Sequence, residues 1–260
     1  MGKLFDFYFE NNKEILIDTF ISCFNLTEEE MQTFKKTVRN KNQSSKLYKY
    51  LKKIKKDKYD DSYQIVLAHL TTVDEEIIKK TGIKSLRTLI EDDSSEIYKI
   101  LAKNNVFINV KKRCVPYDNN MYSLNNASMW KLEEAIIGER ACANGFIYTR
   151  NITNYNPSIC AAPEIINKID SVFRTCIAND WKRTHKELNV VFFKTSLSNL
   201  MEGYRSESFV EIICKIIFNL MFKDDKSGSF EEAGLYDDID PKNIIKIEKA
   251  SNSICAKHNY

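Results

Sequence analysis

The stretch Tyr63–Thr72, YQIVLAHLTT, marks the point at which the chain changes its pattern. It is short, apolar and rich in residues that favour extended backbone, and it runs directly into TVDEEIIKKTGI, whose helical pattern closes at Gly82. A strand followed at once by a helix is therefore predicted here. The strand carries a histidine, His69, followed closely by the hydroxyl residues Thr71 and Thr72.

Upstream of this strand the pattern is helical. From Leu4 to Lys56 apolar residues recur at intervals of three and four, and Thr27 with Glu30 forms the sequence signature of a capping box. We therefore predict an N-terminal helical module over residues 1–60. Its many phenylalanines exceed what a short surface helix needs, so the module is expected to pack on the rest of the chain or on a protein partner.

The end of this module is strongly basic. Seven lysines lie between Lys46 and Lys58, interleaved with Tyr48 and Tyr50. Such a face is typical of a surface that binds nucleic acid or an acidic partner, and it is more often simply the solvated side of an outer helix. Both interpretations stay open at this point.

Downstream, strand and helix patterns alternate. GFIYTRN and LNVVFFKTS predict strands near residues 145–150 and 189–195, and the segments 163–184 and 208–222 have helical periodicity. The short segments EEAGLY and NIIKIEKA predict strands on either side of a turn at Pro241. The predicted fold class is α+β, with the helical module followed by a mixed β-sheet domain over residues 61–260.

Composition narrows the classes of function. The net charge of the 260 residues is only +3, so the overall balance demands no polyanionic partner. The seven cysteines are odd in number and form no C-x-x-C pair, which favours reduced thiols over disulfides or a metal site. No apolar run reaches the length of a signal peptide or a membrane span, which predicts a soluble, cytoplasmic protein that does not contact a membrane.

Three segments resemble ADP-ribosyltransferases of the His-Tyr-Glu type. VLAHLTTVDEEIIKKTGI resembles their first strand and helix, GFIYTRN their tyrosine strand, and EEAGLYDDIDPKNI their terminal glutamate strand with its Ile-x-Pro corner. The three segments occur in the family's order, and the resemblance covers residues 63–250. The distance from His69 to Tyr148 implies an insertion between Leu86 and Ala143.

The resemblance implies a site that consumes NAD as its substrate. Glu232 would be the catalytic residue, because cleavage of the nicotinamide–ribose bond develops positive charge that a carboxylate stabilises. His69, with Thr71 beside it, would bind the ribose, and Tyr148 would stack on the nicotinamide ring. Glu231, the neighbour of Glu232, would point to the opposite face of the strand.

The implied function is an intracellular ADP-ribosyltransferase, a toxin or a defence effector, that modifies a protein or a nucleic acid. The lysine-rich segment gives a slight preference for nucleic acid. The alternative, from another class, is a non-catalytic interaction protein built on a transferase-like scaffold. A helical ribonuclease centre at Arg183 and His185 is disfavoured, because residues two apart lie on different faces of a helix.

Overall fold

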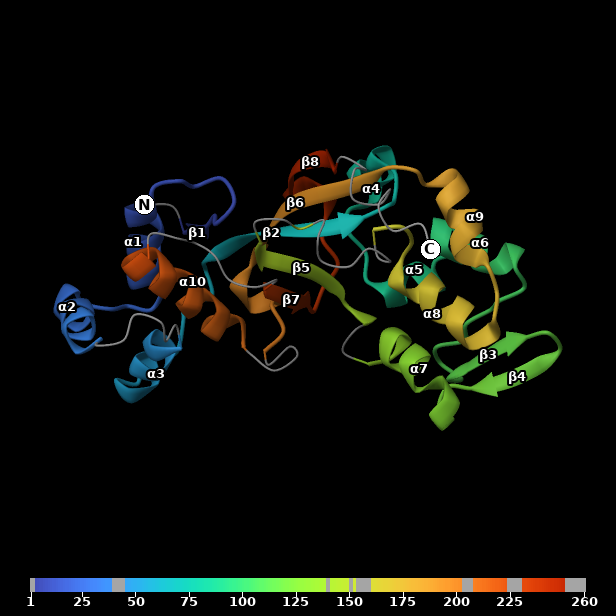
Figure 1. The fold of residues 1–260 in the computed structure, drawn as a ribbon, viewed down its shortest axis with the longest axis horizontal. Helices are drawn as coiled ribbons and strands as arrows, with labels where there is room; N and C mark the ends of the chain where they lie inside the picture. The colour runs from blue at the N-terminus through green and yellow to red at the C-terminus, as the bar shows by residue number, and fades with distance from the viewer. Residues whose placement is uncertain are drawn as a thin grey trace. The chain divides into compact units, whose positions relative to one another are not determined.

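A computed structural model describes residues 3–38, 45–138, 141–149, 152, 160–202, 208–223 and 231–250. These residues form helices and sheets, which confirms the α+β class (Figure 1). The chain divides into two compact units, each assembled from separate segments. The first unit comprises residues 1–68, 145–150 and 192–233, and the second comprises 69–144, 151–191 and 234–260. The predicted domain bounds, residues 1–60 and 61–260, stay a prediction.

The elements of each unit are as follows. The first unit contains β1 (Leu4–Phe5), α1 (Lys13–Cys23), α2 (Glu28–Thr37), α3 (Lys46–Lys53) and α10 (Phe209–Lys223). The second contains α4 (Glu75–Thr81), α5 (Leu86–Glu91), α6 (Glu96–Lys103), β3 (Cys114–Tyr117), β4 (Asn120–Ser123), α7 (Trp130–Ile136), α8 (Glu164–Phe173), α9 (Ile177–Thr184) and β8 (Ile244–Ala250). Four strands contain a boundary between the units: β2 (Gln64–Thr71), β5 (Ala143–Tyr148), β6 (Leu188–Ser196) and β7 (Glu231–Leu235).

The main sheet has six strands, in the order β7-β5-β2-β6-β8, with β1 paired to β2. The pairing of β1 with β2 is parallel, and that of β2 with β5 is antiparallel, so the sheet is mixed as predicted. Strands β2, β5 and β6 confirm the strands predicted near residues 64–70, 145–150 and 189–195. The predicted strands on either side of Pro241 are also present, as β7 and β8.

The helices of the first unit pack around α10. This helix contacts α1 and α3, and ten of its fifteen residues are buried, as expected of a helix that is apolar on most sides. Phe34 of α2 lies against α10 through Phe218, at a ring-centroid distance of 6.2 Å. The N-terminal helices therefore pack on a helix of their own unit. The predicted capping box of Thr27 and Glu30 is present at the start of α2.

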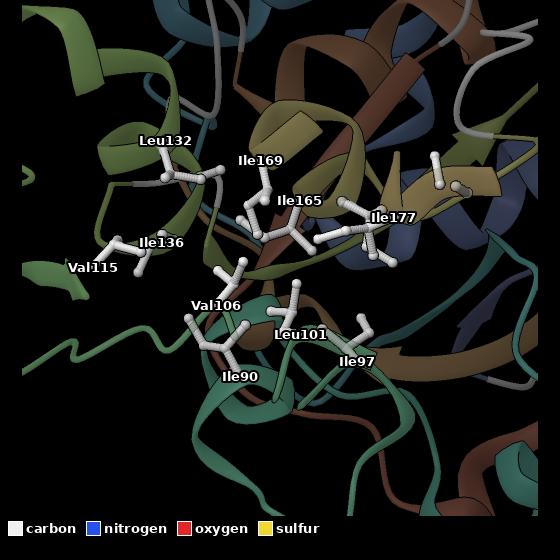
Figure 2. Close-up of a cluster of buried hydrophobic side chains, with 14 of the residues drawn as sticks. Ile90, Ile97, Leu101, Val106, Val115, Leu132, Ile136, Ile165, Ile169 and Ile177 are labelled. Carbon is white, nitrogen blue, oxygen red and sulfur yellow. The ribbon is translucent and has the colours of Figure 1, made fainter. Parts of the chain in front are cut away.

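The second unit has its own apolar core (Figure 2). Aliphatic side chains from α5, α6, α7, α8 and α9 meet there, and Leu132, Ile136, Ile165 and Ile169 are fully buried. The segment between Leu86 and Ala143, expected as an insertion, supplies α5, α6, α7 and the β3–β4 hairpin. This segment therefore contributes a packed core to the second unit.

The helical pattern over residues 163–184 forms two helices instead of one. Arg174 adopts a left-handed backbone with φ of 56° at the end of α8, which stops the first helix. The Asp170 carboxylate then accepts hydrogen bonds from the backbone N–H groups of Ile177 and Ala178, at 2.8 and 2.9 Å. This carboxylate satisfies donors that the start of α9 would otherwise leave unpaired.

Candidate active site

His69 lies near the end of β2 and is held in a neutral form. Its Nδ1 is 2.8 Å from the carbonyl oxygen of Asn144, which can only accept, so Nδ1 carries the proton. Burial is the main cause that lowers the pKa of His69 below its usual value, and this hydrogen bond opposes the shift. Nε2 is then an unprotonated acceptor, suited to a hydroxyl donor such as that of a ribose.

Thr71 shares a face of β2 with His69, because side chains two residues apart in a strand point the same way. Its hydroxyl oxygen accepts a hydrogen bond from the backbone N–H of Val73, at 3.2 Å, where the strand ends. The hydroxyl therefore shapes the turn that leads from β2 into α4. Thr72, on the opposite face, is buried at 4 % exposure.

The register of β2 and β5 separates His69 from Tyr148. Ala68 lies opposite Phe146 in this antiparallel pair, so these two side chains point to the same face of the sheet. Tyr148, two residues after Phe146, belongs to that face, whereas His69 points to the other one. Strand alternation from this pair therefore does not support the expected stacking of Tyr148 on a nicotinamide held by His69, which stays a prediction.

Tyr148 instead packs against an N-terminal tyrosine in the first unit. The rings of Tyr8 and Tyr148 have their centroids 5.5 Å apart, and the Tyr8 hydroxyl donates to the carbonyl oxygen of Phe146, at 3.0 Å. Burial raises the pKa of Tyr8 well above its usual value, so its hydroxyl stays protonated as a donor. This contact fastens the segment after β1 to β5.

Glu232 is a buried carboxylate on β7. Its exposed fraction is 8 %, and its neighbour Ala233 is 1 % exposed. A carboxylate at this depth is stable only when polar neighbours compensate its lost hydration. Strand β7 lies next to β5, and Glu232 and Tyr148 both belong to the first unit. The side chain of Glu231 lies outside the described residues.

The Ile-Asp-Pro corner after β7 is fixed by the loop that follows α4. Ile83 and Ile239 exchange two backbone hydrogen bonds, of 3.0 and 2.8 Å. Asp238 accepts from the backbone N–H of Ser85, at 2.6 Å, and lies 3.7 Å from the ammonium group of Lys84. The corner is therefore held by a bridge and a carboxylate as well as by the fixed φ of Pro241.

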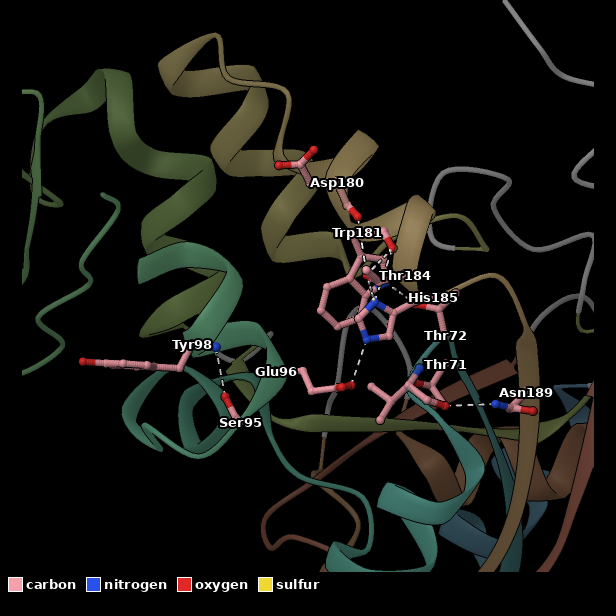
Figure 3. A network of polar contacts seen from close by, with 11 residues as sticks. Thr71, Thr72, Ser95, Glu96, Tyr98, Asp180, Trp181, Thr184, His185 and Asn189 are labelled. Atoms are coloured by element: carbon pink, nitrogen blue, oxygen red, sulfur yellow. Dashed lines mark hydrogen bonds and ion pairs between the residues drawn. The ribbon is translucent and has the colours of Figure 1, made fainter. Parts of the chain in front are cut away.

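A separate polar network occupies the second unit (Figure 3). His185 stacks on Trp181 with a centroid distance of 3.7 Å, and its Nε2 lies 2.9 Å from the carboxylate of Glu96. The indole N–H of Trp181 donates to the Thr72 hydroxyl, at 2.8 Å. The network thereby links the end of β2, α6 and α9. The sequence suggested His185 only as a partner of Arg183 in a ribonuclease centre. The side chain of Arg183 instead forms an ion pair with Asp180.

The comparisons with known proteins give no relative for this chain: no family model, no curated protein and no solved structure matches it. In the part of the chain that the structure describes, no helix has both the length and the apolar character needed to cross a bilayer. The same residues contain no group of three or more His, Cys, Asp or Glu side chains arranged to hold a metal ion.

Proposed function

We propose that this chain is an NAD-dependent ADP-ribosyltransferase, acting inside cells as a toxin or defence effector. The observation that carries the proposal is the burial of Glu232 on β7, a strand of the mixed sheet. An exposure of 8 % is low for a carboxylate, and it places Glu232 where water is largely excluded. The sequence around it, with its Ile-Asp-Pro corner, is the segment that resembles the terminal strand of the His-Tyr-Glu transferases.

The chemistry assigned to Glu232 follows from the bond that breaks. Loss of nicotinamide from NAD leaves a ribose carbon with oxocarbenium character, and a carboxylate near that carbon stabilises the developing charge. A site shielded from water strengthens this interaction, because the effective dielectric constant is lower there. The acceptor oxygen or nitrogen then bonds to the ribose carbon, and its proton is released to a base or to water.

His69 is assigned the role of a binding residue. Its neutral ring, held through Nδ1 by the Asn144 carbonyl, offers Nε2 as an acceptor for a ribose hydroxyl. Thr71, on the same face of β2, supports the turn beside it. Tyr148 has no contact with NAD in this proposal, since its strand position directs it to the opposite face from His69.

The acceptor is proposed to be a macromolecule, with nucleic acid favoured over protein because of the lysines of α3.

The experiment that tests this class of function uses the purified full chain, radiolabelled NAD and a cell lysate. Transfer of label to protein or nucleic acid, with release of nicotinamide, supports the proposal. Absence of both products would favour the alternative, a non-catalytic interaction protein, for which the separation of His69 from Tyr148 is the supporting observation.

A further inference from the structure

The solvent-facing side of α3 presents a row of lysines. Its apolar residues Leu47 and Leu51 are fully buried, whereas Lys49, Lys52, Lys53 and Lys55, which follows the helix, are exposed. Residues at spacings of three and four lie on one side of a helix, so Lys49, Lys52 and Lys53 form one surface. We call the four exposed residues the lysine surface.

The electrostatics of α3 are unfavourable for the helix itself. Like charges three and four residues apart repel, and each such pair lowers helix stability by roughly 0.2–0.5 kcal/mol. The first turn contains no acidic residue, although the positive end of the helix dipole favours one there. The helix is held by burial of Leu47 and Leu51 and by the Tyr50 hydroxyl, which donates to the Glu30 carbonyl at 2.9 Å.

Acidic groups offset this charge in part, since Asp57 and Glu211 both act to raise the pKa of Lys52. Between Lys46 and Lys58 the sequence has seven lysines and one acidic residue, Asp57. Lys56 is set apart from the lysine surface, because its ammonium group lies 2.8 Å from the carboxylate of Glu30. In the part of the chain that the structure describes, Lys49, Lys53 and Lys55 form no ion pair.

An aromatic ring lies beside the lysines. The ammonium group of Lys52 is 4.5 Å from the ring centroid of Tyr48, four residues earlier on α3. A hydrogen bond with Tyr48 is the main cause that raises the pKa of Lys52, so this lysine is charged at neutral pH. A cation next to a partly exposed ring is a combination that suits a nucleotide, whose phosphate and base meet both groups.

We propose that the lysine surface of α3 binds the phosphate backbone of a nucleic acid without reading its sequence. Lysine acts as a flexible point charge, which suits contact with phosphates rather than base recognition. Insertion into a membrane would require exposed apolar residues on the same side of the helix, and those of α3 are buried. An acidic protein partner would need a cluster of apolar anchor residues at the centre of its contact, whereas Leu47 and Leu51 of α3 are buried and Tyr48 is the aromatic neighbour of the lysines.

The inference deepens the proposed function, because it names the surface that would hold a nucleic-acid acceptor. It rests on that function only in treating the bound nucleic acid as the acceptor of ADP-ribose. The binding itself requires no NAD. If nucleic acid binds and NAD is not consumed, the transferase proposal fails alone. If NAD is consumed and nucleic acid does not bind, the inference about the lysine surface fails alone.

The experiment measures fluorescence anisotropy of labelled single-stranded RNA and duplex DNA against the full chain, over roughly 50–200 mM salt. The test variant combines Lys49→Gln, Lys52→Gln and Lys53→Gln. The matched control removes the same charge from exposed lysines of the second unit, with Lys103→Gln, Lys111→Gln and Lys112→Gln. Circular dichroism and urea unfolding establish that both variants are folded.

We expect the test variant to bind about tenfold or more weakly than the wild type. Its slope of log affinity against log salt should be smaller by roughly 2 for single-stranded RNA, since each lost phosphate contact removes about 0.7. The control variant should keep most of the affinity. Equal losses of affinity in the two variants would overturn the proposal. Displacement of RNA by poly-glutamate at an equal concentration of charges would also overturn it. Either result would show that the chain attracts polyanions in general, without a preference for this surface or for phosphate.

Discussion

The carbonyl oxygen of Ile239 lies 1.8 Å from the point where a β-carbon on Gly82 would be placed, and Pro241 Cδ is 3.1 Å from the same point. Gly82 also has a φ of 76°, which other residues rarely adopt. The glycine that ends α4 is therefore needed twice, for its backbone conformation and for the close approach of the Ile-Asp-Pro corner. The sequence predicted the first requirement and gave no sign of the second.

Gly82→Ala should lower the free energy of unfolding by more than about 2 kcal/mol, because left-handed strain and the collision with the Ile239 carbonyl act together. Urea unfolding of the full chain measures the loss. Lys80→Ala, an exposed change on the same helix, is the control and should have an effect within about 0.5 kcal/mol. Similar losses of the free energy of unfolding in the two variants would show that the Ile-Asp-Pro corner can shift away from residue 82 at little cost.

The hydrogen bond from Trp181 to Thr72 should make a measurable contribution to stability. Trp181 is fully buried and Thr72 is 4 % exposed, so Trp181→Phe leaves a buried hydroxyl without its donor, at a cost of about 1–3 kcal/mol. Thr72→Val removes the other partner. Urea unfolding of both single variants and the double variant should give a coupling energy near 1 kcal/mol. Strictly additive losses of the free energy of unfolding would show that this hydrogen bond does not contribute to stability.

His69 should make stability depend on pH. The pKa of His69 is lowered in the folded chain, chiefly by burial, from the value near 6.5 that holds in the unfolded chain. The unfolded state therefore binds a proton first as pH falls through about 6.5, and the free energy of unfolding decreases below that pH. Unfolding at pH 7 and pH 5 should show a larger decrease for the wild type than for His69→Gln. An equal decrease would mean that other groups cause it.

Local patterns accounted for much of the fold. The runs around Ile65–Ala68 and Val190–Phe193 predicted buried strands, and Thr27 with Glu30 predicted a helix start that the structure contains. These features depend on a few adjacent residues, so a single sequence carries them. The β3–β4 hairpin was missed, although Asp118 and Asn119, both with positive φ, form the type of turn pair that favours a two-residue hairpin.

Other features depend on contacts between distant segments. The break at Arg174 requires a non-glycine residue in a left-handed backbone, which no local pattern signals. The separation of His69 from Tyr148 follows from the pairing of Ala68 with Phe146, and a shift of that register by one residue would have reversed it. The strands that carry the candidate site residues were therefore predictable, whereas the face to which each of these side chains points was not.

Nicotinamide release from NAD by the wild type and by Glu232→Gln tests the central claim most directly. The substitution keeps the shape of the side chain and removes its charge, so the rate should fall about a hundredfold or more. Urea unfolding should establish that the variant is folded. A wild type that releases nicotinamide and loses this activity in the variant is the predicted result. Equal rates in the two proteins, or no release by a folded wild type supplied with lysate, would contradict the account.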